Sequence, residues 1–265
     1  MRILLFRAFR WLALLLFAAS SAGCATGPGR DPRDPLEPMN RTVYQFNDHV
    51  DRVLLKPAAI IYNTTVPPPV RGGVSNFFGN FRDVTTAVNN LLQAKFKWAA
   101  SDVGRVLVNS TVGIFGMFDV ASRIGLQKHS EDFGQTLAVW GTPDGPYIVL
   151  PILGPSTARD SAGLIGDYFT DPEFFLFNDP PGTYIVFTTR VVSVRADLLE
   201  AGQIFDAAAI DRYAFLRDAY LQRRHNLIND GQAPPAGEPD TRHRKTLKEL
   251  EEELDAEPPA PAKDR

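Results

Sequence analysis

The sequence predicts a mainly α-helical protein. Across the central part of the 265-residue chain, apolar residues recur every three or four positions, which is the spacing of one helix face. Only residues 147–153 and 184–194 are rich in β-branched and aromatic residues, and both stretches are short and isolated. The single cysteine, Cys24, excludes an internal disulfide or a cysteine cluster for a metal.

Residues 1–23 have the three-part layout of a secretory signal peptide. Three arginines near the N-terminus precede an apolar stretch at residues 11–19, and small residues follow that stretch. The apolar stretch has nine residues, whereas a spanning helix needs about 20. The segment is therefore predicted to be the export signal of a lipoprotein and not a membrane anchor.

The residues Ser21–Cys24 resemble the bacterial lipobox, in which a signal peptidase cuts before a cysteine that then receives lipid chains. We expect Cys24 to be lipidated, and a free or buried cysteine is the alternative. Each buried CH₂ group contributes about 0.8 kcal/mol, so three acyl chains hold a protein on a bilayer stably. Ala25 stands where an aspartate would resemble the inner-membrane retention signal, which favours the periplasmic face of the outer membrane.

Cleavage before Cys24 leaves 25 basic and 31 acidic residues, a net charge of −6. A nucleic-acid-binding surface needs clustered positive charge to neutralise phosphates. We therefore expect no nucleic-acid partner.

The two ends of the mature chain differ in composition from its middle. Residues 24–38 are predicted to be a Pro-rich tether, because proline and glycine at this density neither continue a helix nor fill a core. Residues 231–265 hold six prolines and a charged segment with leucines at helical spacing. We expect a solvated tail with one marginal helix, with a docking helix as the alternative. The folded body is then predicted over residues 39–230.

Four amphipathic helices are predicted within the body, beginning at Val43, Phe77, Val103 and Ile210. The first is predicted to end at Pro57, because proline interrupts a helix. Basic residues at 223–225 suit the C-terminus of the last helix.

Two apolar stretches fit a compact soluble bundle poorly. Residues 109–125 are apolar on all sides and interrupted by glycines, and residues 171–181 place four large apolar residues between two Asp-Pro turns. A loop that inserts into lipid or a partner has this composition, and so does a loop that folds back onto the core. No segment of the mature chain reaches 18 consecutive apolar residues, so amphipathic helices lying in one leaflet are the membrane alternative to core helices.

Residues 132–160 are the most patterned part of the chain, with glycines and prolines that fix one backbone path. Residues 147–153 are expected to point either into a core or into a channel. Arg159 and Asp160 indicate either an ion pair at a helix N-terminus or, for Arg159, a contact with a polar headgroup.

The residues do not indicate catalysis. The four histidines are far apart and lack metal-ligand spacing, and no glycine-rich phosphate motif is present. Ser156 is the nearest approach to an exposed turn serine, but it lacks the Gly-x-Ser-x-Gly elbow. We expect neither an enzyme nor a cofactor, with a lipid hydrolase as an alternative.

Several short motifs occur together in one order: Asp34–Glu37, Asn40-Arg41, Phe46-Asn47, the block from Phe133 to Asp160, Asp211–Tyr213, Arg217 and Tyr220. In this combination, over residues 24–230, the sequence resembles the MlaA/VacJ family of outer-membrane lipoproteins. The resemblance implies a ring-like bundle of amphipathic helices with Gly/Pro-rich loops around a central channel, embedded in one leaflet of the outer membrane.

The resemblance also implies a function and partners. Family members remove mislocalised phospholipids from the outer leaflet and pass them to a soluble periplasmic carrier protein, beside a trimeric outer-membrane porin. This activity maintains the lipid asymmetry of the outer membrane. The competing hypotheses are a hydrolase acting on lipids and an envelope scaffold that transports nothing.

On the same resemblance, the candidate channel or gating residues are Phe46, Asn47, Phe115, Tyr147, Leu150 and Pro151. Phe46 and Asn47 are expected to belong to the packing that keeps the channel gated. Loosening that packing is expected to let inner-leaflet lipid leak outward.

Overall fold

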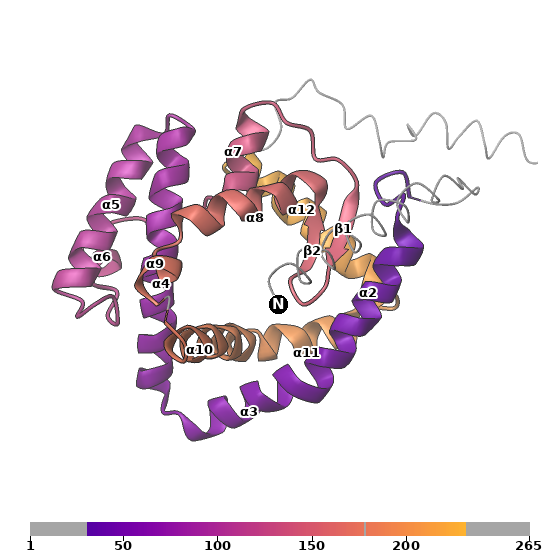
Figure 1. Cartoon of the computed structure of the whole chain (residues 1–265), viewed down its shortest axis with the longest axis horizontal. Helices are drawn as coiled ribbons and strands as arrows, with labels where there is room; N and C mark the ends of the chain where they lie inside the picture. The colour runs from indigo at the N-terminus through magenta and orange to yellow at the C-terminus, as the bar shows by residue number, and fades with distance from the viewer. Residues whose placement is uncertain (1–30, 178, 232–265) are drawn as a thin grey trace, which may run out of the picture. The chain divides into compact units, whose positions relative to one another are not determined.

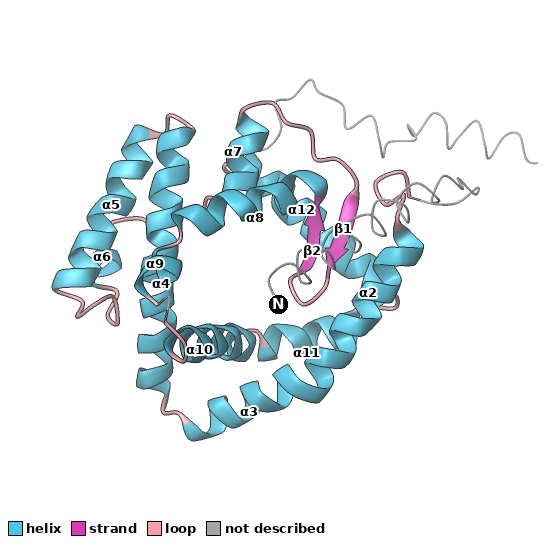
Figure 2. Ribbon diagram, in the orientation of Figure 1, coloured by secondary structure: helices cyan, strands magenta, loops and turns pink. Residues whose placement is uncertain are grey.

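The computed structural model describes residues 31–177 and 179–231, and these residues are mostly helical. The chain divides at Asn229 into two compact units, and every helix and strand described below belongs to the first (Figures 1 and 2). The predicted signal peptide, Cys24 and the tail from residue 232 onwards lie outside the described residues.

The first unit combines helices of different lengths with one hairpin. In chain order its elements are α2 (Glu37–Val50), the π-helical turn η1 (Asp51–Leu55), α3 (Lys56–Thr65), α4 (Pro68–Leu92), α5 (Phe96–Thr111), α6 (Val120–Arg123), α7 (Phe133–Val139), β1 (Tyr147–Leu150), β2 (Gly154–Thr157), α8 (Ala158–Thr170), α9 (Pro172–Leu176), α10 (Gly182–Asp197), α11 (Leu199–Ala208) and α12 (Arg212–Ile228). The helices predicted from Phe77, Val103 and Ile210 are confirmed as α4, α5 and α12.

Contacts between these elements form a closed circuit within the unit. α2 continues through η1 into α3, α3 packs against α10, and α10 packs against α4 (Figure 1). From α4 the contacts run to α8, from α8 to β2, and from β1 back to α2. α5 packs on α4 and α6 on α5, while α12 contacts both α7 and β2.

The first predicted helix does not end at Pro57. α2 passes into the π-turn η1, and the N–H of Lys56 bonds to the carbonyl of Asp51, five residues back. A proline has no N–H, and its ring clashes with the carbonyl four residues earlier in a regular α-helix. The wider π-turn before Pro57 accommodates that ring, so α3 continues the chain beyond it.

Residues 184–194, whose composition favours a strand, lie within α10. β-branched residues favour a strand only where another strand is present to pair with. In the described chain the only sheet is the β1–β2 hairpin, whereas α10 packs against α3 and α4. Tertiary contacts therefore override the local preference.

The stretch 147–153 does form a strand over Tyr147–Leu150. β1 pairs antiparallel with β2, from Tyr147 opposite Thr157 to Leu150 opposite Gly154. The turn between the strands uses left-handed backbone at Ile152 and Gly154, with φ of 68° and 86°. Tyr147 and Val149 point into a small core that also contains Tyr213 of α12.

Residues 31–38 belong to the folded unit, although their composition predicts a tether. Asp34 is fully buried, and the N–H of Asn40 bonds to the carbonyl of Leu36 at the start of α2. Pro38 fits there because the first turn of a helix leaves its backbone donors unpaired in any case.

Candidate functional site

Asn40 of α2 binds the backbone of the hairpin. Its side-chain amide donates to the carbonyl of Tyr147 at 3.0 Å, and its Oδ1 accepts from the N–H of Val149 at 2.9 Å. Asn40 is fully buried, so both bonds lie away from solvent. The side chain therefore pairs with the free edge of β1 much as a neighbouring strand would.

Asn47 makes the equivalent pair of bonds at the hairpin turn. Its amide donates to the carbonyl of Leu150 at 2.9 Å, and its Oδ1 accepts from the N–H of Ile152 at 2.7 Å. Seven helical residues separate Asn47 from Asn40, or about 10.5 Å at 1.5 Å per residue. The three residues from Tyr147 to Leu150, whose carbonyls the two amides bind, span about 10 Å of extended chain, so one face of α2 covers the whole edge of β1.

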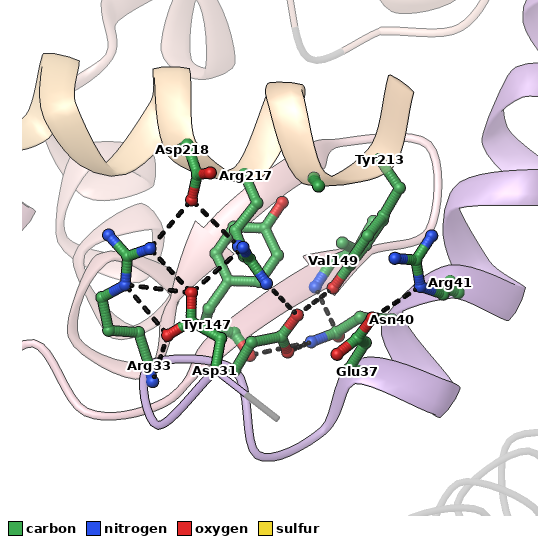
Figure 3. Close-up of polar contacts among 12 residues, drawn as sticks. Asp31, Arg33, Glu37, Asn40, Arg41, Tyr147, Val149, Tyr213, Arg217 and Asp218 are labelled. Atoms are coloured by element: carbon green, nitrogen blue, oxygen red, sulfur yellow. Dashed lines mark hydrogen bonds and ion pairs between the residues drawn. The ribbon is translucent and has the colours of Figure 1, made fainter. Parts of the chain in front are cut away.

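The residues 31–36, here called the N-terminal strap, attach to the same hairpin and to α12 (Figure 3). The carboxylate of Asp34 accepts from the side-chain amide of Asn40 at 2.8 Å and from the hydroxyl of Tyr213. The guanidinium of Arg217 lies 3.6 Å away. Burial, and then the bond to Asp34, raises the pKa of the Tyr213 hydroxyl above its ordinary value.

Ion pairs fix the beginning of the strap. Arg33 pairs with Asp31 at 2.7 Å and with Asp218 at 3.0 Å, while Arg217 pairs with Asp31 at 3.0 Å (Figure 3). The carbonyl of Arg33 accepts from the N–H of Tyr147 at 3.1 Å. The hydrogen bond from Arg33 lowers the pKa of Asp31 to about 2, so this carboxylate stays charged.

A second buried polar cluster joins α7, α8 and α12. Arg224 pairs with Asp132 at 3.0 Å and with Asp160 at 2.8 Å, and the hydroxyl of Tyr220 donates to Asp160 at 2.7 Å. Although burial favours the neutral acid, Arg224 and Tyr220 hold the pKa of Asp160 below its ordinary value.

Arg159 forms an ion pair at a helix N-terminus, as one of the two interpretations of the sequence predicts. It is only 5% exposed at the start of α8, and it pairs with the neighbouring Asp160 at 3.1 Å and with Asp144. Because its charge is neutralised inside the fold, Arg159 offers nothing to a lipid headgroup in this structure.

Phe115 lies in an exposed turn after α5. Phe115 is 76% exposed, and its φ of 54° is in the left-handed region. At Gly116 a Cβ atom would come within 2.7 Å of the Cβ of Asn80, so the turn needs glycine there. Its backbone is fixed by a bond from the N–H of Gly116 to the carbonyl of Asn109 at 2.8 Å.

Ion pairs of the buried side chain of Arg105 hold the segments next to this turn. Arg105 is fully buried and pairs with Asp83 and with Asp119, each at 3.1 Å. Its guanidinium also donates to the carbonyl of Leu126 at 2.8 Å. Removing one partner from such a group is costly because a charge remains buried without compensation.

The other candidate residues are spread between the core and the surface. Tyr147 is 1% exposed and packs with Val149 and Tyr213, so it belongs to the core and does not line a channel. Phe46 is exposed on α2, Pro151 is exposed at the hairpin turn, and Leu150 is half-buried.

The described surface is apolar over much of its area. The buried side chains are more often polar or charged than hydrophobic, whereas large apolar side chains are exposed on most elements. In the segment 171–181, α9 exposes Phe174, Phe175 and Leu176. No described helix is long and apolar enough to span a bilayer.

Two sequence features were weighed for chemistry, the turn serine Ser156 and the possibility of a metal cluster. The hydroxyl of Ser156 is buried and bonds to the hydroxyl of Ser161 at 2.9 Å and to the carbonyl of Thr157 at 3.2 Å. Neither partner is a general base. Within residues 31–177 and 179–231, no three histidine, cysteine or acidic side chains gather to hold a metal ion.

Two residues central to the site were not assigned a role from the sequence. Asn40 and Asp34 occur in motifs that carry the family resemblance, but composition placed Asp34 in the tether. The spacing of Asn40 and Asn47 by two helical turns was the available signal, since two amides on one helix face can pair with an exposed strand edge.

A helical body with polar groups inside and large apolar side chains outside is typical of a protein whose surface contacts lipid or other proteins. The chain belongs to the MlaA lipoprotein family: the family model, described as MlaA lipoprotein, matches residues 32–227.

Individual relatives agree with this membership. The Intermembrane phospholipid transport system lipoprotein MlaA of Escherichia coli K12 is 33% identical over 252 residues, 92% of this chain and 99% of that protein. An uncharacterized protein of Rickettsia typhi is 40% identical over 148 residues, 55% of this chain and 59% of that protein. A solved structure, described as the structural basis for maintenance of bacterial outer membrane lipid asymmetry, is similar with a TM-score of 0.65 and 32% identity, covering 76% of this chain and all of that chain.

Proposed function

We propose that this protein is an outer-membrane lipoprotein that removes mislocalised phospholipids from the outer leaflet and passes them to a soluble periplasmic carrier. Membership of the MlaA lipoprotein family and the phospholipid-transport name of its Escherichia coli relative support this role. The observation that carries the proposal is the apolar exterior of the described helices around a polar interior.

That exterior suits a position in the inner leaflet of the outer membrane. Burying one large apolar side chain contributes about 1.5–3 kcal/mol, so the three exposed residues of α9 alone supply several kcal/mol of attraction to acyl chains. Because no described helix is suited to span a bilayer, the body is proposed to lie within one leaflet while lipidated Cys24 anchors the chain.

The closed circuit of elements provides the proposed path. A phospholipid needs a polar route for its headgroup beside an apolar surface for its tails, and helices with one face of each kind supply both. The transfer requires no bond to be broken. Lipid then flows from the outer leaflet towards a carrier that binds it more tightly.

The hairpin is proposed as the gate of this path. Its turn, with Leu150 and Pro151, is held to α2 by Asn47, while Phe46 beside it is free to contact lipid. Deleting Phe46 and Asn47 removes both bonds that hold the hairpin turn and rotates the part of the helix that follows by two residues, about 200°, relative to Asn40. The gate then loses its support, and inner-leaflet lipid is expected to leak outward.

Deletion of the gene, followed by measurement of surface-exposed phospholipid, tests the function. Loss of the protein is expected to raise surface phospholipid, and a copy of the gene is expected to lower it again. Unchanged surface phospholipid in the deletion strain would favour an envelope scaffold. Released fatty acid that disappears in a Ser156→Ala protein would favour a hydrolase.

The partners are tested separately. A trimeric porin and a soluble periplasmic carrier are proposed from the family resemblance. Photocrosslinkers placed at exposed Phe115 and Pro151 are expected to capture porin, carrier or lipid in living cells. A crosslinker at buried Tyr147 is the matched control and is expected to capture none of them.

A further inference from the structure

We propose that Arg195 of α10 is a positioning residue for the hairpin gate, because its ion pair with Asp51 fixes the end of α2 that carries Asn47. This assignment rests on the proposed function, in which the hairpin turn gates lipid flow, and adds to it a residue that acts on the turn from a distance. In the described chain Arg195 makes no hydrogen bond to the hairpin, so its effect on the turn passes through α2.

Three polar side chains lie on one face of α2 and the start of η1. Asn40, Asn47 and Asp51 are separated by seven and four residues, so at 3.6 residues per turn their directions differ by about 40° at most around the helix axis. The first two bind the backbone of the hairpin, whereas Asp51 binds Arg195. The face of α2 that supports the hairpin is therefore also the face that α10 holds.

The guanidinium of Arg195 binds the carboxylate of Asp51 through two hydrogen bonds. Nε donates to Oδ1 at 2.6 Å, and Nη2 donates to Oδ2 at 2.9 Å. The two side chains are only 19% and 28% exposed. Such a two-pronged contact fixes the orientation of the carboxylate as well as its distance.

Asp51 is the residue at which α2 passes into the π-turn. Its N–H bonds to the carbonyl of Asn47, and its own carbonyl accepts from the N–H of Lys56. A displacement of Asp51 therefore reaches the backbone of Asn47 through one hydrogen bond. The side chain of Asn47 in turn holds Leu150 and Ile152 at the hairpin turn.

The other ion pairs at this end of α2 hold it less firmly. They join Arg52 to Asp48 at 2.8 Å within the same helical segment, Lys56 to Asp206 at 4.0 Å, and Arg212 to Asp48 at 3.7 Å. Each is longer or more exposed than the pair of Arg195 with Asp51, and water screens exposed pairs. Loss of Arg195 thus removes the strongest charged contact between this end of α2 and another helix.

The beginning of α2 is held independently of Arg195. Asn40 binds the base of the hairpin, and Val43 and Tyr44 pack against the small core around Tyr147. Loss of Arg195 is therefore expected to loosen the hairpin turn and to leave the hairpin base in place.

Amide hydrogen exchange in the purified mature protein tests this expectation. The N–H of Leu153 reports on the turn, and its exchange is expected to accelerate about three- to fivefold in Arg195→Gln. Arg195→Lys keeps the charge but not the two-pronged contact, so its rate is expected to lie between those of Arg195→Gln and the wild type. The amide of Val149 is expected to keep its rate, because Asn40 still holds it.

Arg190→Gln is the matched control. Arg190 lies on the same helix and pairs with Asp171 at 3.0 Å and with Glu173 at 2.6 Å, so its loss breaks ion pairs of α10 that do not involve α2. Leu153 is expected to exchange at the wild-type rate in this variant. An equal acceleration in Arg190→Gln and Arg195→Gln would overturn the assignment, because any loosening of α10 would then suffice.

Combining Arg195→Gln with Asn47→Ala tests the route through α2. If Arg195 acts on the turn only through Asn47, Leu153 exchanges in the double variant at the rate of Asn47→Ala alone. Multiplied rates would mean that Arg195 reaches the turn by another route, and this result would overturn the assignment. An unchanged rate of Leu153 in Arg195→Gln would also overturn it.

Surface phospholipid in cells separates this assignment from the proposed function. Cells with Arg195→Gln are expected to expose more phospholipid than cells with Arg190→Gln, as inner-leaflet lipid leaks outward. Faster exchange of Leu153 with normal surface phospholipid would overturn the role of Arg195 in gating. A deletion strain with unchanged surface phospholipid refutes the transport function itself.

Discussion

Replacing Asn47 with alanine tests whether α2 sets the position of the hairpin turn. The change removes the bonds to the Leu150 carbonyl and to the Ile152 N–H. The bonds from Asn40 to Tyr147 and Val149 remain, as does the pairing of β1 with β2. The variant therefore releases the turn of the hairpin while its base stays attached.

The magnitude follows from the two bonds. A hydrogen bond within a protein contributes about 0.5–1.5 kcal/mol net of its exchange with water. The bond to Leu150 is partly buried, whereas the bond to Ile152 is exposed and water replaces it readily. We expect the turn to be held less firmly by about 1–2 kcal/mol, which raises the population of its open form about 5–30-fold.

Amide hydrogen exchange measures that population. The N–H of Leu153 bonds to the carbonyl of Pro151 at 2.8 Å, so it reports on the turn without bonding to Asn47 itself. Its exchange is expected to accelerate about 5–30-fold in Asn47→Ala, while the amide of Val149 keeps its rate because Asn40 still holds it. Asn40→Ala, the matched control, is expected to accelerate Val149 instead.

Asn47→Asp sharpens the test. Aspartate keeps an acceptor for the Ile152 N–H but has no donor, and it places an oxygen against the Leu150 carbonyl. If Leu153 exchanges at the same rate in the wild type and in both Asn47 variants, the turn holds itself and α2 does not support it. If exchange accelerates in both variants while surface phospholipid stays unchanged, the hairpin moves but does not gate lipid.

Three further perturbations test other parts of the structure. Burial raises the pKa of Asp167 from 3.8 to about 6. A carboxyl group with a raised pKa in the folded state stabilises the fold fully below about pH 4, and this stabilisation is lost as the pH rises through 6. After solvent screening, the free energy of unfolding is expected to fall by about 1–2 kcal/mol over that range. Asp167→Asn should remove that slope from thermal melts, and an unchanged slope contradicts the assignment. Asp34→Ala leaves the Tyr213 hydroxyl without its buried acceptor, whereas Arg217 keeps Asp31 and Asp218, and the variant is expected to cost about 1–3 kcal/mol in denaturant unfolding; a loss below about 1 kcal/mol would mean that water replaces the carboxylate. Cys24→Ala is expected to move the protein from the membrane to the soluble fraction and to abolish complementation, and full complementation by this variant refutes the need for a lipid anchor.

Helices that carry a long stripe of apolar residues on one face were predicted well from the sequence. α4 was predicted from residue 77 and runs from Pro68 to Leu92. Local patterns failed where distant contacts decide the conformation. α10 has a strand-like composition but packs as a helix against α3 and α4, and Pro57 does not stop the chain because a π-turn absorbs its ring.

The site was predictable only in part because its bonds join distant segments. Asn47 and the hairpin residues Leu150 and Pro151 were identified together through the family resemblance, and the structure shows Asn47 bonded to Leu150. The role of Asp34 depends on Tyr213, 179 residues further along the chain. No local pattern contains such a pair, so composition assigned Asp34 to the tether.

The spacing of apolar residues in α4 predicts a helix but does not predict which of its faces is buried. A period of 3.6 residues marks a helix with two unlike faces, but it does not say which face is inside. In α4 the buried face holds Asn80, Asp83 and Asn90, while Leu91 and Leu92 are exposed. Part of this buried polar face is paired, as Asp83 is with Arg105 and Asn90 with Asp102, whereas the Oδ1 atoms of Asn80 and Asn90 have no hydrogen-bond partner in the described chain. Exposed Leu91 and Leu92 lower the free energy only where apolar surroundings cover them, which supports the proposal that these helices lie against lipid.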